Sequence, residues 1–312
     1  MINTQCPICK QHAAPSGKGF LFPFRDEYGN AFRIIRCNNC GNIFSWFAND
    51  IDVNRYYDDL DYSLQDTRNT IFYTIQKIEY TRVIRQLKRL ADPSQKTLLD
   101  FGCGKGVFLS FAKKVFEVKG VETSPPRAGF AEKYFQLEIS RDYYESGQIF
   151  PRKFDLLTIF HVIEHLPDPV TLFHHLLAGN LSQGGILVIE TPNFGSWQSA
   201  WAGNRWMQLD VPRHLSHFEP GIVRKLVESA GCSIIHCQTF SFHLGVMGMA
   251  QTLMSKLGYR GFLMSDLKHK RTWKLTLFLL GIIPFAATLE FLAACNKRGG
   301  VIRYYARKQR ES

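Results

Sequence analysis

The strongest constraint on the fold is a regular alternation of strand and helix patterns that begins at Lys96. The short apolar run Thr97–Phe101 predicts a buried strand, and the glycine-rich turn "GCGKG" follows it directly. A helix over Val107–Val115 and a strand over Val118–Glu122 complete a β-α-β unit. Such units build an α/β fold with a doubly wound, mainly parallel sheet, which binds ligands at the carboxyl ends of its strands.

The alternation continues to the end of the chain. A helix is also expected before the first strand, from an N-cap at Asp66 to about Leu90. Proline at the first helical position and glycine turns mark the later boundaries. The further elements that we expect are helices over Pro169–Ala178 and Pro220–Ala230, and strands over Asp155–Phe160, Ile186–Thr191, Ser233–Phe240 and Val301–Ala306.

The glycine turn discriminates between nucleotide ligands. A phosphate-binding P-loop needs Gly-x4-Gly-Lys-Ser/Thr, but Leu99 and Gly106 occupy the positions of the leading glycine and of the hydroxyl. The dinucleotide pattern GxGxxG is weakened, because Val107 replaces its last glycine. The turn fits Asp-x-Gly-x-Gly-x-Gly from Asp100, and Glu122 at the end of the next strand can take both hydroxyls of a ribose. This pattern favours an adenosyl ligand without phosphate.

Three further motifs follow the turn in a fixed order. They are "FDLLTIFHVIEHLPDP" from Phe154, "LSQGGILVIETPN" from Leu181 and "RHLSHFEPGIVRKLVESAGCSI" from Arg213. Together with the turn they resemble the class I S-adenosylmethionine-dependent methyltransferases over roughly residues 66–308. The resemblance implies a seven-stranded Rossmann-like sheet and S-adenosyl-L-methionine as the cofactor.

The same resemblance implies a set of cofactor-binding residues. The turn would line the methionine part of the cofactor, Glu122 would bind the ribose, and the end of the next core strand, at Phe160, would lie near the amino group. The implied residues are Asp100, Gly102, Cys103, Gly104, Gly106, Glu122, Phe160 and His161.

Methyl transfer from a sulfonium needs an aligned acceptor and, for a hydroxyl acceptor, a general base. Histidine is suited to this role near neutral pH. His165 and Glu164 follow a strand at the mouth of the cleft, where they either act on the acceptor or only fix the loop by hydrogen bonds. We expect His217 to pack or to cap the following helix. The catalytic candidates are His161, Glu164, His165 and His214.

Four of the eight cysteines form two CxxC pairs, with 27 residues between Cys9 and Cys37. The intervening sequence is strand-like and aromatic and has a turn signal at Tyr28-Gly29-Asn30. Two such pairs joined by a hairpin predict a zinc ribbon whose four thiolates are Cys6, Cys9, Cys37 and Cys40. Four protein ligands leave no open position, so we expect a structural Zn2+, with iron as the lesser alternative. The first residues resemble no secretory signal, which favours metal over disulfides in a reducing cytoplasm.

The segment before the last strand is apolar and has basic flanks. Leu275–Leu289 holds 15 uncharged residues and is followed by Glu290. This run is short and proline-broken for a membrane span of about 20 residues. The alternatives are a segment on an anionic membrane surface, which we favour, a buried helical hairpin and a true transmembrane helix. The flanking cations are Lys268, Lys270, Arg271, Lys274, Lys297 and Arg298.

The net charge is +11, and residues 255–312 carry 12 Lys and Arg against 3 Asp and Glu. A basic end of this kind suits a membrane surface, a nucleic acid or a solvated face. The predicted divisions are a zinc-ribbon-like module over 1–47, a connector and helix over 48–92, a cofactor-binding core over 93–241 with 299–312, and an acceptor or membrane-contact insertion over 242–298.

The paired CxxC motifs on this type of methyltransferase resemble proteins of polysaccharide biosynthesis. The favoured function is therefore methylation of a sugar or lipid-linked saccharide in cell-surface polysaccharide biosynthesis, by a cytoplasmic protein that is peripheral at the inner face of the membrane. One alternative is a quinone-type O-methyltransferase, and another is a zinc-ribbon methyltransferase of ribosomal RNA, although nucleic acid is the less favoured partner. A scaffold that only retains the fold is the non-enzymatic alternative.

Overall fold

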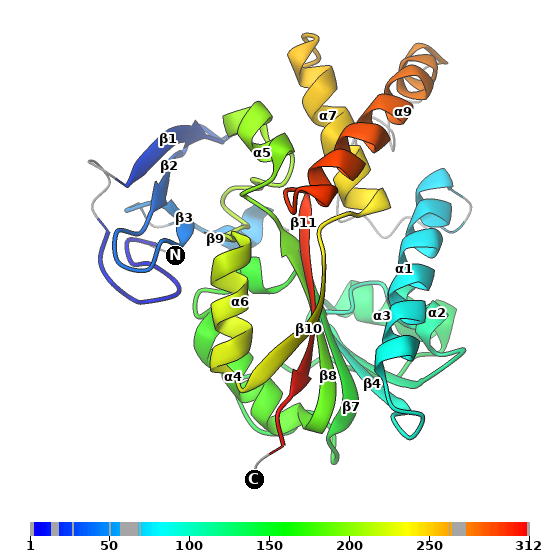
Figure 1. Ribbon diagram of the computed structural model, residues 1–312. Helices are drawn as coiled ribbons and strands as arrows, with labels where there is room; N and C mark the ends of the chain where they lie inside the picture. Colours follow the sequence, from blue (N-terminus) through cyan, green and yellow to red (C-terminus); the bar gives the residue numbers. More distant parts are fainter. Residues whose placement is uncertain are drawn as a thin grey trace.

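Two sheets organise the chain (Figure 1). The computed structural model describes residues 3–13, 19–26, 28–49, 51–56, 68, 70–261, 263 and 273–310. The larger sheet has seven strands in the order β10-β11-β8-β7-β4-β5-β6. Its strands are β4 (Thr97–Phe101), β5 (Glu117–Val121), β6 (Ile139–Ser140), β7 (Phe154–Phe160), β8 (Leu181–Pro192), β10 (Cys232–Gln238) and β11 (Val301–Lys308).

The pairing confirms the predicted doubly wound, mainly parallel sheet. Strands β6, β5, β4, β7 and β8 run parallel to one another, whereas β11 pairs antiparallel with both β8 and β10. The strand order reverses between β4 and β7, because the chain first builds outward to β6 and then returns. Ligands bind at such a reversal, outside the carboxyl ends of the strands.

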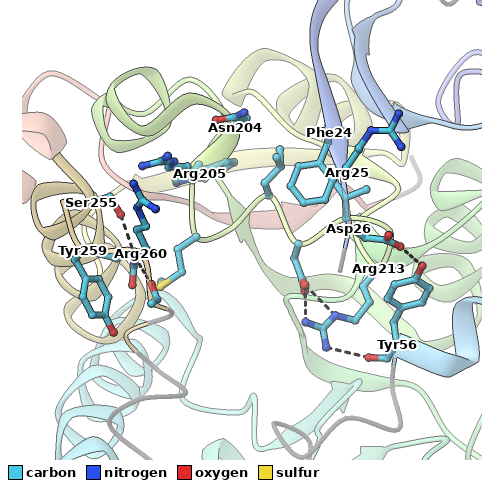
Figure 2. Close-up of a pocket in the computed structure, with 17 residues that line it drawn as sticks. Phe24, Arg25, Asp26, Tyr56, Asn204, Arg205, Arg213, Ser255, Tyr259 and Arg260 are labelled. Atoms are coloured by element: carbon cyan, nitrogen blue, oxygen red, sulfur yellow. Dashed lines mark hydrogen bonds and ion pairs between the residues drawn. The ribbon is translucent and has the colours of Figure 1, made fainter. Parts of the chain in front are cut away.

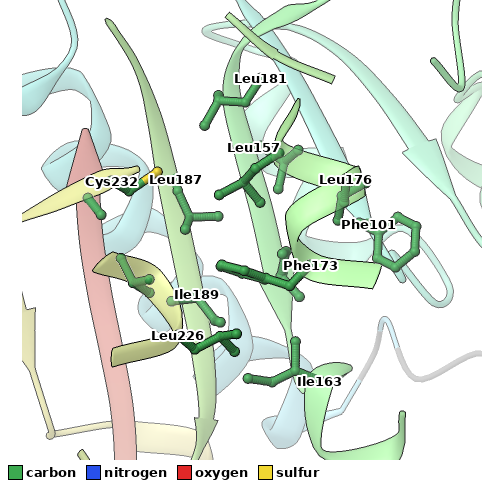
Figure 3. Packing of buried hydrophobic residues seen from close by; sticks show 14 of the residues in the cluster. Phe101, Leu157, Ile163, Phe173, Leu176, Leu181, Leu187, Ile189, Leu226 and Cys232 are labelled. Carbon is green, nitrogen blue, oxygen red and sulfur yellow. The ribbon is translucent and has the colours of Figure 1, made fainter. Parts of the chain in front are cut away.

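Alternate residues of the central strands pack on opposite faces of the sheet. Leu99 and Leu157 pack with Phe173 on the face covered by α4 (Pro169–Asn180) and α6 (Pro220–Ser229) (Figure 3). Leu98 and Leu156 pack on the other face, which α1 (Ile71–Leu90), α2 (Val107–Ala112) and α3 (Pro125–Phe135) cover (Figure 1). Burial of each such side chain stabilises the fold by about 1.5–3 kcal/mol.

The predicted boundaries differ from the observed ones at a few positions. Helix α1 begins at Ile71, because the Thr70 hydroxyl accepts a hydrogen bond from the amide of Tyr73, and the predicted cap Asp66 lies outside the described residues. Helix α2 ends at Ala112, where the amide of Val115 bonds to the Ala112 carbonyl and the chain tightens into a turn. Strand β5 ends one residue earlier than predicted, which leaves Glu122 just beyond the strand.

The amino-terminal module is a second sheet, and it is not confined to residues 1–47. The predicted hairpin is present, but the strand order β1-β2-β3-β9 brings in the pair Ser216–His217 from the "RHLSHF" motif. The module therefore shares a sheet with the loop that carries catalytic candidates. Its own strands are β1 (Phe20–Arg25), β2 (Ala31–Arg36) and β3 (Ile43–Trp46).

The segment between β10 and β11 forms a projecting helical pair (Figure 1). A π-helical turn, η5 (Phe242–Val246), leads into α7 (Met247–Lys256), which packs against α9 (Trp273–Cys295). Within the described residues, no helix is both long and apolar enough to cross a membrane. Of the predicted flanking cations, Lys268, Lys270 and Arg271 lie outside the described residues.

Candidate active site

The glycine turn connects β4 to α2 at the reversal of the sheet. Gly102, Gly104 and Gly106 have φ angles of +78°, +56° and +72°, which residues with a side chain rarely adopt. A Cβ at Gly102 would lie 2.3 Å from Val162, and one at Gly106 would lie 2.6 Å from Leu137. A Cβ at Gly104 would meet no atom of the described chain within 4 Å. Gly104 therefore borders open space, whereas the other two glycines allow close packing.

Two carboxylates lie near this turn, Glu122 on the amide of Gly104 and Asp100 near the end of β4. Glu122 accepts hydrogen bonds from the amides of Gly104 (2.9 Å) and Ser124 (2.8 Å), so the turn and the carboxylate fix one another. Asp100 is buried and accepts a hydrogen bond from the Thr158 hydroxyl at 2.6 Å. Burial and the nearby Glu122 raise the pKa of Asp100 to about 7 despite that bond. A bound cationic group would restore the ionised form, which suits the amino group of an amino-acid ligand.

Two of the predicted cofactor residues have side chains that pack against the protein. The Cys103 side chain packs in the core. Its sulfur lies so near Gly120 that a Cβ there would be only 2.7 Å away. The Phe160 ring packs edge-on against Phe108, with 5.0 Å between the ring centroids, and also contacts Tyr80. A cofactor contact from Cys103 is thus restricted to its backbone.

His161 follows β7 and is held between two buried carboxylates. Its Nε2 lies 2.9 Å from Glu190, its Nδ1 lies 3.3 Å from Glu164, and its φ is +54°. Burial opposes protonation, but hydrogen bonds and charge from both carboxylates raise the pKa of His161 to about 9. The same pairing lowers the pKa of Glu164 to about 2, against the effect of burial. An imidazolium paired in this way is a poor general base, which argues against the predicted base role of His161.

The charge pairing continues through the sheet. Arg303, the third residue of β11, forms ion pairs with Glu190 of β8 and Glu79 of α1. Burial opposes its charge, but these carboxylates raise the pKa of Arg303. Glu79 also accepts a hydrogen bond from the amide of Phe242 at 2.9 Å, which ties η5 to α1. A continuous buried network therefore joins the end of β7 to the base of the projecting helices.

A second cluster brings together Glu164, His165 and His214. Their metal-ligating atoms lie within 4.8 Å of one another, and the two imidazole centroids are 4.6 Å apart. Nδ1 of His165 lies 3.0 Å from the Arg213 carbonyl, and Nδ1 of His214 lies 2.9 Å from the Gln208 carbonyl. A carbonyl only accepts hydrogen bonds, so both Nδ1 atoms carry the proton and both Nε2 atoms keep a lone pair when the rings are neutral.

This cluster can accept a proton or hold a cation. Burial and the neighbouring His214 lower the pKa of His165 to about 4, so His165 is neutral near pH 7. A neutral imidazole is the form that a general base requires. Two imidazoles and one carboxylate are also a donor set that divalent transition metals accept.

The four predicted metal ligands meet in the amino-terminal module. The sulfur atoms of Cys6 and Cys40 are 3.5 Å apart, as are those of Cys9 and Cys37, and all four lie within 4.8 Å of one another. A tetrahedral zinc thiolate site places its sulfurs about 3.8 Å apart, given Zn–S bonds of about 2.3 Å. The geometry and the donor set therefore fit Zn2+. Burial raises the pKa of Cys6 to about 11, so a metal would displace its proton.

Strand β9 ties this module to the histidine cluster. The Ser45 hydroxyl lies 2.9 Å from both the His214 carbonyl and Nε2 of His217. Arg36 and Glu219 form a two-fold ion pair across the same boundary, with contacts of 2.8 and 2.9 Å. His217 is fully buried, so it packs as expected, although its ring bonds to β3 and does not cap α6. The module thus fixes the backbone of the loop that carries His214.

A cavity of about 600 Å3 lies between the amino-terminal module, the 204–213 loop and the end of α7 (Figure 2). On one wall, Asp210 binds Arg213 at 2.6 and 2.9 Å, and Arg213 also donates to the Tyr56 carbonyl at 3.1 Å. The opposite wall carries Arg205 and Arg260. Since the Arg213 carbonyl is the partner of His165, the first wall adjoins the histidine cluster.

Residues 75–237, just over half of the chain, match the Methyltransf_23 family, which is described as a methyltransferase domain. The chain therefore belongs to this family of methyltransferase domains.

The chain is also similar to curated proteins and to solved structures. It is 25% identical over 158 residues to the ubiquinone biosynthesis O-methyltransferase of Histophilus somni (strain 2336), a match of 46% of this chain and 66% of that protein. The same-named protein of Yersinia pestis (strain Pestoides F) is 27% identical over 151 residues, which are 46% of this chain and 62% of that protein. The chain thus spans less than two thirds of these relatives. The structure of the plantazolicin methyltransferase BpumL with SAH shares the fold, with a TM-score of 0.50, 14% identity, and coverage of 82% of this chain and 93% of that one.

Proposed function

We propose that the protein is an S-adenosylmethionine-dependent methyltransferase. The observation that carries this proposal is the open space at Gly104, with Glu122 bound to the Gly104 amide and Asp100 in the preceding strand at the reversal of the sheet. Family membership supports it independently. The Glu122 carboxylate would bind the ribose hydroxyls, and Asp100 would face the amino group. The bound sulfonium supplies an activated methyl group, and the chain must align the acceptor and take up a proton.

We infer that His165 takes up the proton. Its Nδ1 is fixed on the Arg213 carbonyl, which orients the ring, and its lowered pKa keeps it neutral near pH 7. His161, paired with Glu164 and Glu190, holds the loop after β7 in a fixed conformation. We place no proton transfer on His161 or Glu164, and His214 orients the cluster from the facing loop.

The acceptor that we favour is a sugar or a lipid-linked saccharide of cell-surface polysaccharide biosynthesis. The cavity that adjoins the loop of Arg213 supports this class, because its paired charges and hydroxyl-bonding groups can bind the hydroxyls of a saccharide. The second candidate is a quinone-type acceptor, which the names of the curated relatives favour.

The projecting helices support a membrane surface as a further partner. Leu280, Phe285, Phe291 and Leu292 of α9 are 44–69% exposed. Within the described residues 247–261 and 273–300, the single carboxylate is Glu290, and it is buried. Exposed cations near both ends of the helical pair, among them Lys256 and Lys297, complement anionic headgroups. The protein would then be peripheral at the cytoplasmic face.

We also propose a structural Zn2+ in the four-cysteine site. The four sulfurs supply all four ligands of a tetrahedral site. Because β9 pairs with β3 of the same module, the metal would also stabilise the loop of His214.

The activity test uses methyl-labelled S-adenosylmethionine with three acceptor pools: nucleotide sugars, lipid-linked saccharides and quinone precursors. We expect label in a saccharide pool, and a loss of about 10²–10⁴-fold in kcat for His165→Gln with unchanged cofactor binding. His174→Gln, at a half-buried histidine of α4 that bonds to Ser229, is the matched control. Label in the quinone pool alone would transfer the proposal to the second candidate, and an unchanged kcat in His165→Gln would remove the base assignment.

A further inference from the structure

We propose that the cavity between the amino-terminal module and α7 binds a phosphoryl group of the methyl acceptor through Arg205 and Arg260. The inference rests on the proposed function, because it assigns a chemical class to the acceptor of that site. The shared chemistry is a phosphate or diphosphate ester, carried either by a nucleotide sugar or by a lipid-linked saccharide.

The first argument is the state of the charges that line the cavity. Each carboxylate is already paired: Asp210 binds Arg213, and Asp26 bonds to Tyr56 and to Asn30. In contrast, the exposed guanidinium groups of Arg205 and Arg260 have no hydrogen bond or ion pair with any part of the described chain.

The second argument is the placement of these two arginines. Arg205 ends η4 (Gly203–Arg205) and Arg260 follows α7, yet Figure 2 shows both on one wall, opposite Tyr56 and Arg213. Two unpaired positive charges on one wall favour a dianion over a singly charged carboxylate. Guanidinium groups also bind phosphoryl oxygens in pairs of parallel hydrogen bonds, a geometry that lysine does not offer.

The third argument is the direction from this wall to the histidine cluster. The opposite wall contains Arg213, whose carbonyl holds Nδ1 of His165. A volume of about 600 Å3 accommodates a sugar ring together with a phosphoryl group. An acceptor whose phosphoryl group binds Arg205 and Arg260 would extend its hydroxyls toward His165. The acceptor would therefore span the cavity from one wall to the other.

The test is calorimetric titration of the full-length protein with pyrophosphate, with UDP and with vesicles that contain a polyprenyl diphosphate. We expect binding in the wild type and a loss of at least about tenfold in affinity for Arg205→Ala/Arg260→Ala, because the double variant removes the charge-assisted hydrogen bonds to the phosphoryl group. Arg205→Lys should lose less than Arg205→Ala. The matched control is Arg85→Ala, an exposed arginine of α1 outside the cavity.

The outcomes distinguish a nucleotide sugar from a lipid diphosphate. They also distinguish failure of this inference from failure of the proposed function. Tighter binding of UDP than of pyrophosphate assigns a nucleotide sugar, and tighter binding of the vesicles than of UDP assigns a lipid diphosphate. No binding of any probe, or equal affinity in the double variant and the Arg85 control, overturns the inference. Titration with S-adenosylmethionine in parallel tests the proposed function separately, because a protein that binds the cofactor but no phosphoryl probe refutes only the inference.

Discussion

Replacement of Gly104 by alanine should reduce the affinity for the cofactor more than it reduces the stability of the fold. The added Cβ would meet no described atom within 4 Å, so the folded protein has room for it. The remaining effect on stability is the positive φ of +56°, which costs an alanine about 1–2 kcal/mol. Gly231→Ala is the matched control, since Gly231 has a φ of +72° and the same open surroundings but closes α6 away from the site.

The affinity for the cofactor should fall much more in Gly104→Ala than in Gly231→Ala. If S-adenosylmethionine lies against Gly104, a methyl group there overfills the contact, which costs about 1–3 kcal/mol. That energy corresponds to a loss of about fivefold to more than a hundredfold in affinity. Calorimetric titration measures the affinity, and thermal unfolding should show similar decreases for both variants. Equal cofactor affinity in Gly104→Ala and Gly231→Ala would refute the assignment of the open space to the cofactor.

Three further predictions concern the ion network, the metal and the membrane surface. The pKa of His161 is raised from 6.5 to about 9, so its stabilising effect is complete below pH 6.5 and is lost as the pH rises to about 9. In urea unfolding, His161→Gln should lower the free energy of unfolding by about 3–5 kcal/mol at the acidic end, and this difference should shrink across the range. A difference that does not change with pH would contradict the pairing. Elemental analysis should find zinc in the wild type; Cys37→Ser should lose it and should melt at a lower temperature, whereas Cys295→Ser, at an exposed cysteine, should change neither. Phe285→Asp should reduce flotation with anionic liposomes by about tenfold or more, while Ile78→Asp, at an exposed apolar position of α1, should float as the wild type does, and equal flotation of the two variants would exclude α9 as the contact.

The glycine turn and its carboxylates could be predicted because their signals are local. Strand β4, the turn and Glu122 lie within one β-α-β unit, where residue type determines the backbone conformation directly. The four cysteines were predicted for the same reason, since ligand spacing within each CxxC pair is a local property.

Contacts between distant segments could not be read in this way. Glu79 and Arg303 are separated by 224 residues, and their pairing depends on β11 entering the sheet beside β8. A signal was present nonetheless, because a charged residue inside the apolar runs "LVIETP" and "VIRYYA" implies a buried partner. The assignment of Ser216 and His217 to the amino-terminal sheet was missed because a two-residue strand has no periodicity.

The role of His161 depended on the same distant contacts. Its sequence position allowed a base, but Glu190 from the neighbouring strand holds it as an imidazolium. His165 and His214 were predicted from their motifs, whereas their tautomers follow from two backbone carbonyls that only the fold places beside them.

Calorimetric titration of S-adenosylmethionine into the wild type and Glu122→Ala is the most direct measurement of cofactor binding at the turn. Glu122 is buried beside Gly104, whereas Glu138, an exposed carboxylate just before β6, provides the control Glu138→Ala. We predict binding at a single site in the wild type and in Glu138→Ala, and loss of that binding in Glu122→Ala. No binding by the wild type, or equal affinity in all three proteins, would contradict the assignment of this site to the cofactor.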